Sequence, residues 1–162
     1  MTGAATPCLV CGPDTLRRAG AADANAFERL QHAAYAPNRP LLGVEPVPLL
    51  TPAETVLATY EVWLLDQGGG LAGALCLLPR HDDLEIWSVA VDPARQNDGI
   101  GRRLLAAAEA RARELGQDTI RLFTGARLTK NIDWYGRRGY AVERTEERPD
   151  RRLVHMKKTL GT

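Results

Sequence analysis

The sequence predicts an α/β fold in which helices cover both faces of one mixed, mostly antiparallel sheet. Three features indicate it: β-rich runs recur along the chain, helical stretches carry apolar stripes, and glycines and prolines separate these segments. With 162 residues, 44% apolar and 25% charged, the chain suits one globular domain. We expect this domain to span residues 13–162, after an N-terminal extension or loose strand over residues 1–12.

The first part of the chain is expected to supply one strand and two helices. Residues 15–19 form a short β-rich run, and residues 22–35 space their apolar side chains as a helix does. Four prolines break regular structure over residues 36–51. A second helix is expected near Thr51, because Thr51 to Glu54 has the Thr-x-x-Glu pattern of a capping box, with proline at the first helical position.

The rest of the chain alternates strands with helices. A glycine-rich turn predicts a hairpin, an apolar stripe predicts the long helix with Gly116 as its cap, and Gly139 ends a short helix. The expected strands are 60–65, 71–78, 84–91, 119–123, 140–145 and 153–159, and the expected helices are 100–115 and 129–138. A charged turn is expected over residues 146–152.

Composition excludes several classes of function. The 21 basic and 20 acidic residues nearly cancel, so we expect no nucleic-acid partner. No apolar run approaches the roughly 18 residues of a membrane span, and the first residues lack the pattern of a secretory signal, so a cytoplasmic protein is expected. Cys8 and Cys11 have Cys-x-x-Cys spacing, but no second pair completes a zinc site, so no metal is expected.

The segment from Gln96 to Gly101 has the pattern of an anion-binding loop. It follows a buried strand and opens directly onto a helix, whose first N–H groups are unpaired and carry partial positive charge. The two glycines allow a ligand to approach the backbone closely. The spacing Gln-x-x-Gly-x-Gly matches neither a Walker loop nor a dinucleotide-binding fingerprint.

This loop resembles the cofactor loop of the Gcn5-related N-acetyltransferase (GNAT) family. The strand over residues 85–91 is similar to the family's fourth strand, and residues 131–140 are similar to its second signature, Tyr-x-x-x-Gly-Tyr/Phe. The resemblance implies the acyl-CoA N-acyltransferase fold, in which the fourth and fifth strands splay apart, and it makes a homodimer a candidate assembly because dimers are common in the family. It also implies direct acetyl transfer from acetyl-CoA to a primary amine of a small molecule or peptide within a ternary complex. One alternative is a non-catalytic acyl-CoA-binding or sensing module, and another is a nucleotide-binding domain of a different α/β family.

The resemblance also implies which residues hold the co-substrate. Val89 and Val91 would pair with the pantetheine arm, a backbone N–H of this strand would polarise the thioester carbonyl, and Asn131 would contact the arm or the start of a helix. The full expected set is Val89, Ala90, Val91, Gln96, Asn97, Asp98, Gly99, Ile100, Gly101, Arg102 and Asn131. Asn97 departs from the family's usual glycine, and Asp98 adds a negative charge beside the expected diphosphate.

Two residues are candidates for proton transfer. Glu85 matches the general-base glutamate of one branch of the family and would act through water; the other interpretation is a surface-facing strand residue. Tyr135 matches the tyrosine that protonates the leaving thiolate; the other interpretation is an aromatic anchor for the short helix.

The acceptor site is expected to involve residues 35–51 and the turn before Leu84, with Tyr35 and Trp87 as substrate contacts. Three acidic side chains on that side are consistent either with a cationic amine or with a solvated turn: Asp82, Asp83 and Glu85. Four basic residues could meet the 3′-phosphate of coenzyme A or merely solubilise the short helix: Arg127, Lys130, Arg137 and Arg138.

Overall fold

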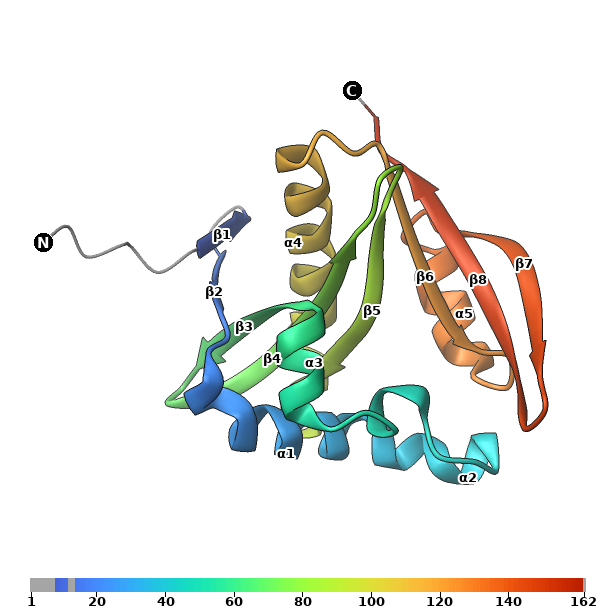
Figure 1. The fold of residues 1–162 in the computed structure, drawn as a ribbon, viewed down its shortest axis with the longest axis horizontal. Helices are drawn as coiled ribbons and strands as arrows, with labels where there is room; N and C mark the ends of the chain where they lie inside the picture. The colour runs from blue at the N-terminus through green and yellow to red at the C-terminus, as the bar shows by residue number, and fades with distance from the viewer. Residues whose placement is uncertain (1–7, 12–13, 162) are drawn as a thin grey trace, which may run out of the picture.

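The computed structural model describes residues 8–11 and 14–161, which form one eight-stranded sheet in the order β1-β2-β3-β4-β5-β6-β8-β7 (Figure 1). All neighbouring strands run antiparallel except β5 and β6. The strands are β1 (Cys8–Cys11), β2 (Asp14–Arg18), β3 (Glu61–Gln67), β4 (Gly70–Pro79), β5 (Leu84–Val91), β6 (Thr119–Gly125), β7 (Ala141–Arg148) and β8 (Arg151–Thr159). The α-helices in the described residues are α1 (Ala24–Tyr35), α2 (Arg39–Leu42), α3 (Ala53–Thr59), α4 (Ile100–Glu114) and α5 (Thr129–Gly136).

Helices cover both faces of the sheet, as the sequence predicts. The apolar stripe of α4 and the partly buried aromatic residues of α5 pack on one face, and α1 and α3 pack on the other (Figure 1). In α1 the buried residues Phe27, Leu30 and Gln31 follow helical spacing. In α4 the stripe ends at a Schellman motif, in which Gly116 takes φ +71° and the N–H of Gln117 reaches the carbonyl of Ala112.

The two halves of the sheet diverge in its middle. β5 and β6 are paired only over three residues, Leu84–Ile86 against Ile120–Leu122, and then separate toward α1 and α2 (Figure 1). Within β5, Trp87 has no partner in β4, because the register shifts there by one residue as in a β-bulge. The splay that the family resemblance implies is therefore present, and it leaves one edge of β5 open beyond Ile86.

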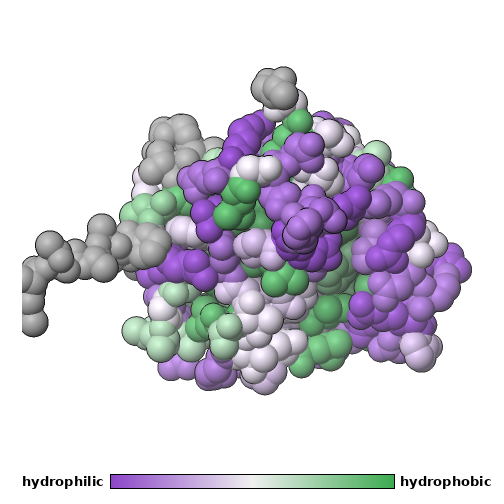
Figure 2. Space-filling view, turned by 45° about the horizontal axis from the view of Figure 1, so that its top comes forward, coloured by the Kyte–Doolittle hydropathy of each residue, from purple (hydrophilic) through white to green (hydrophobic). Residues whose placement is uncertain are grey.

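Two local predictions are wrong. The capping box at Thr51 does not form, because α3 begins one residue later with Pro52 as its N-cap, and the Pro52 carbonyl accepts from the N–H of Val56. The charged turn over 146–152 is instead a continuation of β7 and β8, whose pairing reaches Arg148 and Arg151. β7 is exposed along nearly its whole length, and hydrophilic side chains gather on that side of the molecule in Figure 2.

Residues 8–11, which fall in the predicted extension, pair with β2 as β1. The division into an extension and one domain stays a prediction. Among residues 8–11 and 14–161, no helix is long and apolar enough to cross a membrane.

Candidate active site

The open edge of β5 is marked by Val89, whose backbone groups face away from β4. Its N–H donates to the hydroxyl of Tyr35 at 3.1 Å, and this hydroxyl donates to its carbonyl oxygen at 2.9 Å. Because both backbone groups point into the gap beside β5, an amide-bearing ligand could pair with this edge as an added strand does.

Tyr35 is the last residue of α1, and its side chain reaches this edge of β5. Its hydroxyl also lies 3.0 Å from Oγ of Ser88, which donates to Oε1 of Gln31 at 3.2 Å. Burial raises the pKa of Tyr35 to about 12, although its hydrogen bonds with Ser88 and Val89 act in the opposite direction. The hydroxyl therefore keeps its proton at neutral pH.

A first cavity of about 700 Å³ lies between the β5 edge, the start of α4 and α5. We call it the cradle cavity. It brings together eight of the residues predicted to hold the co-substrate or to take part in catalysis: Val89, Val91, Gln96, Gly99, Gly101, Arg102, Asn131 and Tyr135. Two further residues of the predicted co-substrate set, Ala90 and Ile100, have fully buried side chains in the core, so they could contribute only backbone groups.

Two glycines bring the backbone close to this cavity. Gly99 precedes α4 with φ +73°, a conformation that L-residues rarely adopt. A Cβ on Gly101 would lie 3.1 Å from the ring of Trp134, so a larger residue here would require that ring to shift by a few tenths of an ångström. The first amide groups of α4 consequently open onto the cavity, as an anion site at a helix start requires. Asp98 does not line the cavity, and the side chain of Asn97 lies outside the described residues.

Positive charge is concentrated around the cradle cavity. Arg102, Lys130, Arg137 and Arg138 line it, against one carboxylate, that of Asp133. Burial lowers the pKa of Arg138, and repulsion from Arg102 and Arg137 lowers it further. Nε of Arg138 is buried and has no hydrogen-bond partner in the described part of the chain. A diphosphate is the kind of group that such uncompensated donors fit.

A second, narrower cavity of about 90 Å³ adjoins the cradle cavity, and we call it the acceptor cavity. The two cavities share five lining residues: Tyr35, Asn38, Val89, Asn131 and Tyr135. Residues 35–51 contribute to the acceptor cavity, as predicted, whereas no residue of the turn before Leu84 lines either cavity. The junction between the cavities is where two bound molecules could meet.

Tyr135 lies at this junction on α5. Its ring makes edge contacts with Trp134 and Tyr140, at centroid distances of 5.1 and 5.9 Å. Burial raises its pKa well above the ordinary value, with smaller contributions from Tyr35 and Tyr140. The packed ring fits the interpretation of Tyr135 as an aromatic anchor, and the protonated hydroxyl fits its interpretation as a proton donor.

Trp87 lines the acceptor cavity and is 8% exposed. Its ring stacks on that of Tyr60 at 4.4 Å, with 17° between the planes. Trp87 is the extra residue of the bulge in β5 and has no pairing partner in β4.

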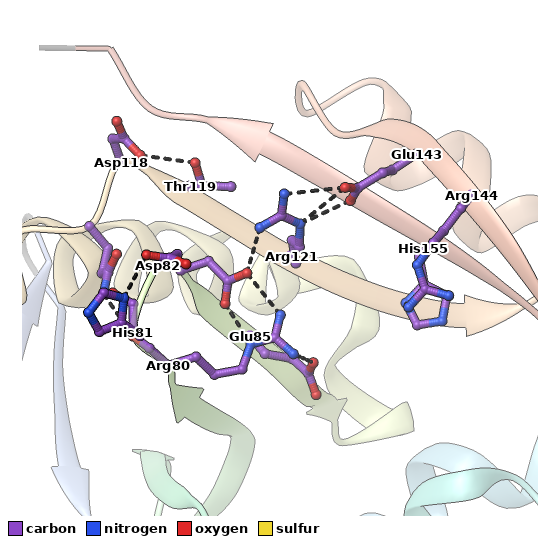
Figure 3. A network of polar contacts seen from close by, with 12 residues as sticks. Arg80, His81, Asp82, Glu85, Asp118, Thr119, Arg121, Glu143, Arg144 and His155 are labelled. Atoms are coloured by element: carbon purple, nitrogen blue, oxygen red, sulfur yellow. Dashed lines mark hydrogen bonds and ion pairs between the residues drawn. The ribbon is translucent and has the colours of Figure 1, made fainter.

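Glu85 lies outside both cavities, in a network of ion pairs (Figure 3). Nη1 of Arg80 bonds its carboxylate at 2.6 Å, while Asp83 accepts from both Arg80 and Arg121. Burial raises the pKa of Glu85 above its usual range, although Arg80 acts in the opposite direction. Four residues of strand, at about 3.3 Å each, separate Glu85 from Val89, so direct contact with an amine at the junction is excluded.

The acidic character predicted for the acceptor side is therefore largely neutralised. Asp83 is 6% exposed and bound by two arginines, and Asp82 is exposed beside His81. Arg127 is also not where the sequence predicts, because its Nη1 lies 3.3 Å from the carbonyl of Leu42 at the far side of the acceptor cavity.

Sequence reasoning misses several lining residues of the acceptor cavity: Phe123, Leu128, Arg151 and Arg152. They come together through the pairing of β6 with β8 and the packing of α2 on β6. No local pattern in the sequence joins them.

Comparison with known proteins agrees with this geometry. The sequence profile of the acetyltransferase (GNAT) family matches residues 27–140. The N-acetyltransferase YvbK of Bacillus subtilis (strain 168), itself uncharacterized, is 33% identical over 85 residues, which are 52% of this chain and 53% of YvbK. The chain thus spans about half the length of that relative.

Two solved structures share the fold at lower identity. The ribosomal-protein-S18-alanine N-acetyltransferase of Escherichia coli superposes with a TM-score of 0.74 at 19% identity, over 92% of this chain and 95% of that one. A GNAT family acetyltransferase of Elizabethkingia anophelis with acetyl-CoA bound superposes with a TM-score of 0.69 at 17% identity, over 90% and 97% of the two chains.

Proposed function

Because this chain belongs to the acetyltransferase (GNAT) family, we propose that it is an N-acetyltransferase that uses acetyl-CoA to acetylate a primary amine by direct attack in a ternary complex. The observation that carries the proposal is the junction of two cavities, one lined by cations and helix-start amides, the other mostly by apolar side chains. Tyr35, Val89 and Tyr135 belong to both cavities, so a thioester in one could meet an amine in the other.

The residues of the cradle cavity suit coenzyme A. The amide groups around Gly99 and Gly101 and the guanidinium groups of Arg102 and Arg138 would hold the diphosphate. Val89 would offer its N–H and carbonyl to the pantetheine arm once the Tyr35 hydroxyl moves aside. When bound, acetyl-CoA supplies an acetyl group activated as a thioester.

Proton transfer is assigned to two residues. The attacking amine must lose a proton, since an alkylamine has a pKa of about 10.4, and we assign this proton to Glu85 through intervening water. The amine nitrogen then bonds to the carbonyl carbon while the carbon–sulfur bond breaks, and the nitrogen releases its second proton to water as the amide forms. Tyr135 gives its hydroxyl proton to the leaving sulfur and later regains one from solvent; its raised pKa keeps it in the donor form.

The test is a titration with coenzyme A followed by thiol release from acetyl-CoA across a panel of primary amines. We expect binding, turnover with at least one amine, and a loss of about 10²-fold or more in kcat for Tyr135→Phe with little change in coenzyme A affinity. Full activity in Tyr135→Phe would refute the acid role. Coenzyme A binding without turnover would favour the binding or sensing module, and no binding would overturn the proposal.

A further inference from the structure

The acceptor cavity has an unusual charge pattern for an enzyme that takes amines. Among the described residues that line it none is acidic, and the charged ones are Arg151 and Arg152. The remaining walls are mostly apolar or aromatic and include Trp87, Phe123 and Leu42. Such a cavity disfavours a polycation, which would meet two arginines and no carboxylate.

Arg151 is the more deeply placed of the two arginines. Its side chain is 8% exposed, and its Nε and Nη2 bond the carboxylate of Asp150 at 3.3 and 3.1 Å. Asp150 itself is 56% exposed. Nη1 of Arg151 makes no hydrogen bond to any residue that the structure describes, so part of its planar set of donors is available to a ligand.

Positive charge increases beyond Arg151. A further cavity of about 500 Å³ at the tip of the β7–β8 hairpin shares Leu42, Arg151 and Arg152 with the acceptor cavity. Arg127 and Arg148 also line this outer cavity, so its lining carries four guanidinium groups and the two carboxylates of Glu147 and Asp150. Glu147 pairs with Arg152, Asp150 with Arg151, and Glu146, which does not line the cavity, with Arg148. The path from the junction outward is therefore first apolar and then basic.

We propose that the acceptor is a small primary amine whose apolar or aromatic body ends in a carboxylate, which binds Arg151. This inference rests on the proposed function for the position of the amine. With the nitrogen at the junction beside Val89 and Tyr135, the body would lie against Trp87 and Phe123. The carboxylate would then reach the free Nη1 donors of Arg151, an arrangement suited to the planar guanidinium.

Matched pairs of probes test the carboxylate directly: 4-(aminomethyl)benzoate against benzylamine, and 6-aminohexanoate against hexylamine. We expect kcat/KM for thiol release to favour the better-fitting carboxylate over its matched amine by about tenfold or more. Arg151→Gln should bring this ratio close to one and leave coenzyme A affinity unchanged. Arg144→Gln, on an exposed arginine of the same hairpin that lines neither cavity, should keep the wild-type ratio.

The ratio separates recognition from a structural role, because a general disturbance of the hairpin would slow both members of a pair alike. If Arg151→Gln fails to fold, Arg151→Lys, which cannot bind a carboxylate with two parallel donors, should still lower the ratio. Equal rates for both members of both pairs would overturn the inference and leave the proposed function intact. If no amine reacts, calorimetry of the same probes against the coenzyme A complex decides. Binding of the carboxylates that depends on Arg151 supports the inference, and absence of binding refutes it.

Discussion

Replacing Tyr35 with phenylalanine tests whether its hydroxyl competes with the co-substrate for the open edge of β5. The hydroxyl is hydrogen-bonded to both the N–H and the carbonyl of Val89, and it lies 3.0 Å from Oγ of Ser88. Phenylalanine keeps the ring on α1 and removes these contacts. A net hydrogen bond is worth about 1 kcal/mol, and the freed groups of Val89 can take up water from the gap. We therefore expect the free energy of unfolding to fall by about 1–2 kcal/mol.

The affinity for coenzyme A should rise in this variant, although the stability falls. The wild-type protein must break the contacts between Tyr35 and Val89 before the pantetheine arm can pair with β5, whereas the variant need not. Recovering about 1 kcal/mol of binding free energy lowers Kd about fivefold. Calorimetric titration with coenzyme A measures this, and thermal unfolding of the ligand-free protein should show a decrease of about 2–8 °C.

Tyr60→Phe is the matched control for this experiment. Its ring stacks on Trp87, its hydroxyl has no hydrogen bond to the described residues, and it lines neither cavity. Both Kd and unfolding temperature should stay close to wild type. An unchanged or raised Kd in Tyr35→Phe would show that the co-substrate does not take the positions that the hydroxyl holds, and would refute the reasoning.

Two further predictions concern the ion-pair network of Figure 3. Glu85→Gln should lower kcat/KM by about tenfold or more near neutral pH, where the wild-type carboxylate is ionised, and flatten the acidic limb of its pH profile; a profile identical to wild type would exclude Glu85 as base. Asp83→Asn should lower the free energy of unfolding by about 2 kcal/mol at neutral pH, because its buried carboxylate is bound by Arg80 and Arg121. Burial raises the pKa of Asp83, but the bonds from these arginines outweigh it and lower the pKa overall. Its stabilisation is thus present above the unfolded pKa of about 3.9 and lost as pH falls below it, so urea unfolding should show the two proteins converging below about pH 4. A constant difference across that range would contradict this assignment.

The sequence predicts the centre of the fold well because glycines and changes in the hydrophobic pattern mark the ends of its strands and helices. The strand 84–91 agrees with β5, and the helix 100–115 agrees with α4 to within one residue. Gly116 ends that helix as predicted. The secondary structure near the C-terminus is harder to predict from the sequence. β7 has almost no buried residues, so its sequence shows no alternation of apolar and polar side chains. Its run of charged residues is also typical of a solvent-exposed turn.

The same distinction holds for the candidate site. The cradle cavity is built largely from two stretches, residues 89–102 and residues 130–138, each of which a local pattern can identify. The acceptor cavity joins Leu42, Phe123 and Arg151, and only tertiary packing brings such distant residues together. Glycine at position 125 permits this packing, since a Cβ there would lie 2.6 Å from Leu42.

The short ladder between β5 and β6 has a mechanical consequence. Only three residue pairs join the two halves of the sheet through backbone pairing, while one apolar cluster beneath them contains residues of both halves, including Ile86, Leu122 and Met156. Side-chain packing, which is less directional than a ladder of hydrogen bonds, therefore carries much of the connection. The width of the opening beside β5 is consequently set more by how these side chains pack than by backbone hydrogen bonds.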